Sequence, residues 1–81
     1  MARIIDGEKL NIVGENVKKA RKGAKMSQQE LADKLETIAV YICRGSISRI
    51  ESGERTVTDI ELTGLSKVLG VSIQYFFESQ E

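Results

Sequence analysis

The strongest constraint on the fold is a pair of helix-start signals, each followed by apolar residues at helical spacing. Ser27 and Glu30 form a Ser-x-x-Glu capping box, in which each side chain bonds the backbone N–H of the other residue. Thr58 and Glu61 repeat this pattern. The apolar residues after the first box recur every three or four positions: Leu31, Ala32, Leu35 and Ile38. The pattern predicts an amphipathic helix with an extra turn reaching Ile38, followed by a connector over residues 39–42.

The segment from Arg44 to Ser52 predicts another amphipathic helix, ended by Gly53 in a left-handed cap. Ile47 and Ile50 are three positions apart and should face the core. The polar residues of its other faces are Arg44, Ser46, Ser48 and Arg49. A helix that exposes arginine and small hydroxyls can enter a DNA major groove, where arginine pairs bidentately with guanine.

Two residues at the start of this segment are unusual for a helix. Cys43 stands at the N-cap position, where a thiol is a weak acceptor. We interpret it as a small structural residue, with redox sensing as the alternative. Gly45 lowers helix propensity. It either lets the backbone approach DNA closely or is simply tolerated in the first turn.

Three further helices are predicted around these two. Asn11 should cap a helix that reaches Lys22 and ends at Gly23. Its core side chains would be Val13, Val17 and Ala20. The helix after Thr58 should end at Gly70, with Ile60, Leu62, Leu65, Val68 and Leu69 mostly in the core. Ser72 should cap a short last helix in which one phenylalanine, Phe76 or Phe77, completes the core, leaving the other or Tyr75 exposed.

Composition excludes several classes of function. Eighty-one residues make one domain, for which we expect a leader at 1–10, a folded unit at 11–77 and a tail at 78–81. The chain has no histidine and one cysteine, which argues against an internal disulfide, a zinc site, a catalytic triad and any cofactor. The longest apolar run, 38–43, is too short to span a membrane. We therefore expect a soluble cytoplasmic protein that is not an enzyme.

Charge is distributed unevenly along a chain whose formal net charge is zero. Residues 1–57 hold 11 Lys/Arg against 8 Asp/Glu, whereas residues 58–81 hold 1 against 4. Positive charge therefore accompanies the part of the chain that contains the predicted binding unit, and negative charge accompanies the tail. Overall neutrality argues against strong non-specific DNA affinity, which comes from clustered Lys and Arg. It says little against sequence-specific binding.

Three stretches of the chain resemble the Cro/repressor type of helix-turn-helix regulator, the XRE-like family. They are Ser27–Leu35, Ser46–Gly53 and Leu65–Phe76, and residues 11–22 fit the preceding helix. The resemblance implies an all-α, compact, five-helix, lambda-repressor-like DNA-binding domain. Leu31 and Ser48 are 17 positions apart, more than the family usually has, so helix 2 or the following turn is lengthened.

The resemblance also implies a role for individual residues. Arg44, Gly45 and Arg49 would read base edges, and Ser46 and Ser48 would contact phosphates or bases. Gln28 would contact a phosphate and support the recognition helix, while Ser52, Arg55 and Thr56 would contact the DNA backbone. Arg21 would pair with Glu51 and tie the first helix to the end of the third.

These expectations define a function. The chain should be a sequence-specific, nucleoid-associated transcriptional regulator that binds a double-stranded DNA operator and represses by occupancy. A thin core and leftover aromatic surface predict a homodimer formed through the C-terminal helix. The alternative is a protein-interaction module that keeps the fold without binding DNA, which net neutrality and Gly45 would suit.

Overall fold

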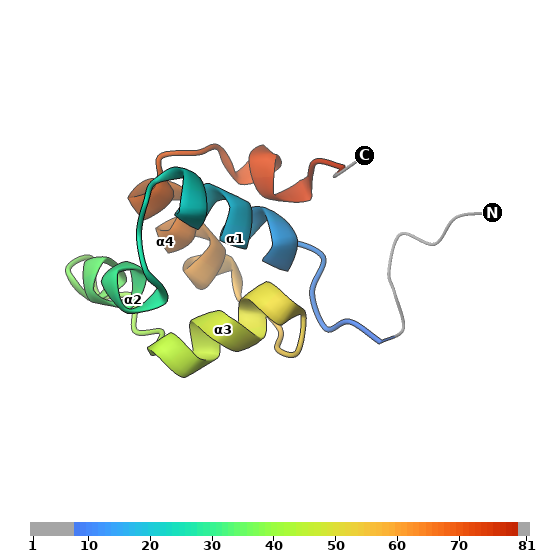
Figure 1. The fold of residues 1–81 in the computed structure, drawn as a ribbon, viewed down its shortest axis with the longest axis horizontal. Helices are drawn as coiled ribbons and strands as arrows, with labels where there is room; N and C mark the ends of the chain where they lie inside the picture. The colour runs from blue at the N-terminus through green and yellow to red at the C-terminus, as the bar shows by residue number, and fades with distance from the viewer. Residues whose placement is uncertain (1–7, 80–81) are drawn as a thin grey trace.

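The computed structural model describes residues 8–79, which form four α-helices and a terminal 3-10 helix (Figure 1). The elements are α1 (Gly14–Gly23), α2 (Gln28–Glu36), α3 (Arg44–Ser52), α4 (Asp59–Leu69) and η1 (Ile73–Phe77). The predicted all-α fold is confirmed, with a 3-10 helix as its fifth element, and residues 8–79 contain no strand. Within the expected leader, the pair Asp6-Gly7 is typical of a turn, but it lies outside the described residues.

The helices pack around one another so that α3 lies at one side of the domain. α3 contacts α1 and α2, α4 contacts the same two helices, and η1 packs on α1 and α4. Figure 1 shows α3 along the lower side of the molecule and η1 at the opposite side. One face of α3 is therefore left without a neighbouring helix.

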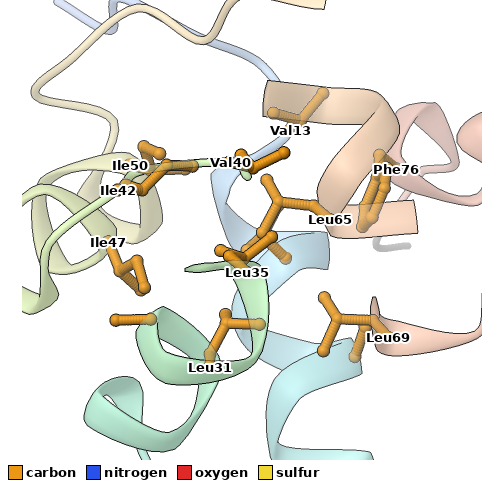
Figure 2. Packing of buried hydrophobic residues seen from close by; sticks show 13 residues of the cluster. Val13, Leu31, Leu35, Val40, Ile42, Ile47, Ile50, Leu65, Leu69 and Phe76 are labelled. Carbon is orange, nitrogen blue, oxygen red and sulfur yellow. The ribbon is translucent and has the colours of Figure 1, made fainter. Parts of the chain in front are cut away.

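All five elements contribute to one hydrophobic core, shown in Figure 2. Its largest fully buried side chains are Phe76, Leu31, Leu35, Ile47, Ile50, Leu65 and Val17. Each such side chain contributes roughly 1.5–3 kcal/mol on burial. As predicted, one phenylalanine completes the core: Phe76 is fully buried, whereas Phe77 is 52% exposed.

The predicted helix starts after Ser27 and Thr58 are confirmed. Each hydroxyl accepts a hydrogen bond from the backbone N–H three residues later. Each glutamate carboxylate accepts one from the backbone N–H of the capping residue, so both capping boxes are complete. Ser72 accepts from the N–H of Tyr75 and caps η1 in the same way. Gly53 and Gly70 end α3 and α4 with φ of 80° and 69°, in the left-handed conformation that favours glycine.

The predicted start of α1 is wrong in detail, whereas its predicted end at Gly23 is confirmed. Val13, not Asn11, is the N-cap, although the Asn11 Oδ1 atom accepts from the N–H groups of Val13 and Gly14. At the other end, Gly23 is an ordinary last helical residue, and Lys25 adopts the left-handed conformation with φ of 60°. Backbone bonds from Lys25 and Met26 back into α1 stabilise this turn.

The predicted extension of α2 is also wrong. The α-helix ends at Glu36, and residues 37–39 form a tighter turn in which N–H groups bond carbonyls three positions back. Ala39, with φ of 61°, ends this turn. The change of period carries Ile38 off the buried stripe, so it is 42% exposed, and Val40 is buried instead.

In the connector, Ile42 is buried in the core and Tyr41 is exposed. One core prediction in α4 is wrong, because Ile60 is 70% exposed. It lies in the first turn of α4, one turn before the buried Gly64. Val40 packs so closely over Gly64 that a Cβ atom there would lie 2.8 Å from the Val40 Cγ2 atom. The connector covers α4 at Gly64 and leaves Ile60 uncovered.

Candidate nucleic-acid interface

The free face of α3 carries most of the residues expected to contact DNA. Ile47, Ile50 and Glu51 are buried and fix the rotation of the helix. Residues three or four apart lie on one side of a helix, so the opposite side forms one continuous face. Its exposed members are Arg44, Gly45, Ser48, Arg49 and Ser52. The helix thus presents two guanidinium groups, two hydroxyls and a bare stretch of backbone together.

The guanidinium groups of the two arginines on this face are unpaired within the described residues. Within residues 8–79, neither Arg44 nor Arg49 has a hydrogen-bond or ion-pair partner for its guanidinium group. A Cβ atom added at Gly45 would approach only the Arg49 guanidinium, at 3.8 Å. The fold itself therefore does not require glycine at position 45. Both guanidinium groups keep their full set of donors for another molecule.

A buried ion pair holds the inner side of α3 against α1. The Arg21 Nε atom donates to the Glu51 Oε2 atom at 2.6 Å, and Nη2 donates to Oε1 at 3.0 Å. Arg21 also donates to the Met26 carbonyl at 2.8 Å, and Gln28 donates to Glu51 at 3.1 Å. Hydrogen bonding to Glu51 raises the pKa of Arg21. The pair implied by the resemblance is thus present, and the Gln28 amide supports α3 through Glu51.

Asn11 holds the same C-terminal end of α3 as the ion pair does, a role that the sequence pattern did not predict. Its Nδ2 atom donates to the carbonyls of Ile50 at 3.0 Å and Arg55 at 2.8 Å. Gly14 permits this contact, because a Cβ atom there would collide with the Ile50 carbonyl oxygen. The Leu10 N–H also donates to the Gly53 carbonyl at 2.8 Å. The start of α1 and the end of α3 are therefore locked together.

Arg55 differs from the α3 arginines because it is already paired. Its Nη1 and Nη2 atoms donate to the two Glu61 carboxylate oxygens at 2.9 and 2.7 Å. The same carboxylate completes the capping box at Thr58. The sequence pattern predicted the role of Glu61 in that box but not its bond to Arg55. A phosphate contact by Arg55 would have to share this guanidinium with Glu61.

This pairing should make part of the stability depend on pH. The bond from Arg55 lowers the pKa of Glu61, so the carboxylate stabilises the fold above its ordinary pKa, and this contribution is lost as pH falls through the lowered value. We expect Glu61→Gln to reduce stability at pH 7 and to flatten its decline toward about pH 3. Urea unfolding across this range measures both effects. Glu36→Gln, at an exposed carboxylate without an ion pair in residues 8–79, is the control. Parallel pH profiles for wild type and Glu61→Gln would contradict the prediction.

The remaining predicted contact residues are partly engaged with their neighbours. The Ser52 hydroxyl donates to the Glu54 carboxylate at 2.7 Å and also lies 3.2 Å from the Arg49 carbonyl oxygen. Thr56 is exposed. The Cys43 thiol donates to the half-buried Ser46 hydroxyl at 3.4 Å and provides no N-cap bond, as predicted. When Cys43 is deprotonated, the Ser46 hydroxyl donates to the thiolate instead, and this stabilisation lowers the pKa of the Cys43 thiol.

No helix within residues 8–79 has the length and apolar character needed to cross a membrane. The same residues contain no group of three or more His, Cys, Asp and Glu side chains placed to hold a metal ion.

Comparison with known proteins agrees with this geometry. A helix-turn-helix family model matches residues 17–76. The chain is also 36% identical over 66 residues to an uncharacterised HTH-type transcriptional regulator, YqaE, of Bacillus subtilis (strain 168). That match covers 82% of this chain and 53% of the relative, so the chain spans about half the length of the protein it matches. The matched residues run from α1 through η1 and include the whole of α3. The chain therefore belongs to the XRE-like helix-turn-helix family.

Proposed function

We propose that this chain is a transcriptional regulator that binds a double-stranded operator with α3 in the major groove and represses by occupancy. The observation that carries the proposal is the exposed pair Arg44 and Arg49, which have no intramolecular partner within residues 8–79. They project from a helix whose C-terminal turn is held by the Arg21–Glu51 pair and by Asn11. Rigid placement of bidentate donors is what base-specific recognition requires.

The proposed contacts divide by position. Arg44, Gly45 and Arg49 face base edges, where a helix without a side chain at residue 45 can approach more closely. Ser46 and Ser48 contact bases or phosphates. Gln28, Ser52, Arg55 and Thr56 contact the sugar-phosphate backbone, which sets the register of the helix on the duplex. Of this last group, Arg55 should contribute least because Glu61 already holds it.

Selection of DNA from a random library by the purified protein tests this function. Enrichment of a defined motif, whose affinity falls steeply as salt rises, is the expected result. A reporter with the motif placed over a promoter should then be repressed. Absence of any binding at low salt would instead favour the protein-interaction module, and activation of the reporter would overturn repression by occupancy.

We further propose that the protein binds as a homodimer on a pseudo-palindromic site. Two recognition helices reach successive major grooves on one face of DNA only when they are about 34 Å apart. The proposed dimer surface is η1, where Ile73 and Phe77 are 41% and 52% exposed. Sedimentation of the complex should show two chains per site. Phe77→Glu should weaken operator binding without unfolding the chain, and one chain per duplex at saturation would contradict the proposal.

A further inference from the structure

A second apolar surface lies between α4 and the connector that follows α2. The groove has a volume of about 340 Å³, and its lining residues are Ile38, Val40, Asp59, Ile60, Thr63, Gly64 and Lys67. Ile38 and Ile60 are the exposed apolar side chains of its walls. The wall formed by the connector belongs to the stretch that is longer than the family pattern. This surface is separate from the free face of α3 and from Ile73 and Phe77 on η1.

Charge along the groove follows a pattern that is complementary to itself. Asp59 stands at the first residue of α4 and Lys67 in its last turn, with Thr63 midway between them. Eight residues of helix separate the two charges by about 12 Å, too far for them to pair within one chain. Neither charge takes part in an ion pair within residues 8–79.

We propose that the groove binds a second copy of this chain, with the two α4 helices antiparallel about a twofold axis at Thr63. This arrangement sets Asp59 opposite the partner's Lys67, and by symmetry it does so twice. Ile60 of each copy, which is 70% exposed, is then covered by the facing α4 helix of the other. Antiparallel packing also places the oppositely charged ends of the two helix dipoles together.

The contact does not depend on DNA binding and adds to the proposed η1 contact. Two different self-interfaces on one chain allow dimers on neighbouring operators to join. Phe77→Glu disables the proposed η1 surface, so this variant is the background in which the α4 contact is measured alone. Phe77 is half exposed, and the substitution should therefore leave the core intact.

A mixing experiment tests the pairing. In the Phe77→Glu background, Asp59→Lys and Lys67→Asp should each weaken self-association about tenfold, because both ion pairs become like-charge contacts. An equimolar mixture of the two variants should recover the affinity, since the mixed dimer restores both opposite-charge contacts. Sedimentation equilibrium without DNA measures the self-association of each variant and of their mixture. Recovery on mixing excludes misfolding as the cause of the single losses.

Ile60→Glu provides a second, independent variant. Ile60 is 70% exposed, so the variant chain should fold normally. Its self-association affinity should fall at least tenfold, even when the substitution is added to the charge-swapped mixture. Lys18→Glu, on the exposed side of α1, is the matched control and should change nothing. A monomeric Phe77→Glu background at millimolar concentration, or self-association unaffected by Ile60→Glu, would overturn the proposal. Either result would leave operator binding by the α3 face untouched.

Discussion

Replacing Arg21 with alanine should lower the free energy of unfolding by about 3 kcal/mol, as expected when one partner of a buried pair is removed. The side chains of Arg21 and Glu51 are only 9% and 4% exposed. Without the guanidinium, Glu51 would keep a single hydrogen bond, from Gln28, for a carboxylate that remains out of water. The loss of stability therefore comes mainly from leaving the buried Glu51 carboxylate without its partner, rather than from losing the attraction between the two charges. Urea denaturation at neutral pH measures it.

Two further variants separate burial from charge. Arg21→Lys keeps the positive charge but not the planar guanidinium that bonds both carboxylate oxygens. We therefore expect a loss in the free energy of unfolding between zero and that of Arg21→Ala. The double variant, Arg21→Ala with Glu51→Ala, leaves no buried charge unpaired. Its loss in the free energy of unfolding should therefore be smaller than the sum of the losses of the two single variants. Lys22→Ala, an exposed basic residue beside Arg21, should stay within about 0.5 kcal/mol of wild type. An Arg21→Ala loss as small as that of Lys22→Ala would show that the pair does not hold α1 to α3.

Local signals in the sequence predicted the starts of α2, α4 and η1 correctly. A capping box or a serine N-cap is satisfied by side chains within three positions, so tertiary contacts hardly alter it. Gly53 and Gly70 were predictable for the same reason, since a left-handed residue after a helix depends on local backbone strain. The core positions of α1 and α3 followed from helical spacing alone.

The errors arise where distant segments decide the outcome. Ile38 and Ile60 have the spacing of core residues, but a tight turn removes Ile38 from its stripe, and the connector covers α4 only at Gly64. Asn11 was expected to cap a helix, yet half of its hydrogen bonds go to carbonyls 39 and 44 positions away. No periodicity in one sequence carries that information.

The candidate site was predictable in its outline but not in its electrostatics. The exposed face of α3 followed from Ile47 and Ile50, whereas the Arg21–Glu51 pair was inferred only through resemblance to a family. Arg55 and Arg49 look equivalent in the sequence. Only the three-dimensional structure shows that Glu61 neutralises Arg55 and that Arg49 has no such partner within residues 8–79. This difference predicts that the α3 arginines and Arg55 affect DNA binding in different ways.

Arg44→Ala and Arg49→Ala should each relax base preference at a particular operator position, by about 1–3 kcal/mol of lost discrimination. Both side chains leave an exposed helix face without intramolecular partners in the described chain, so their donors are free to bond guanine in the major groove. Titrations against a set of single-base operator variants measure the effect. In these titrations, each substitution should flatten the preference at one base pair and leave the others unchanged.

Arg55→Ala is the matched comparison, because it also removes one arginine close to α3. We expect it to weaken binding to all operator variants alike and to reduce the salt slope by at most about one, since Glu61 already offsets its charge. Lys19→Ala on α1 removes an exposed charge outside the proposed interface and should leave base preference unchanged. If Arg44→Ala and Arg49→Ala instead lower affinity uniformly, as a backbone contact would, then α3 is not the helix that reads the bases. The function would then have to be sought in another face of the domain.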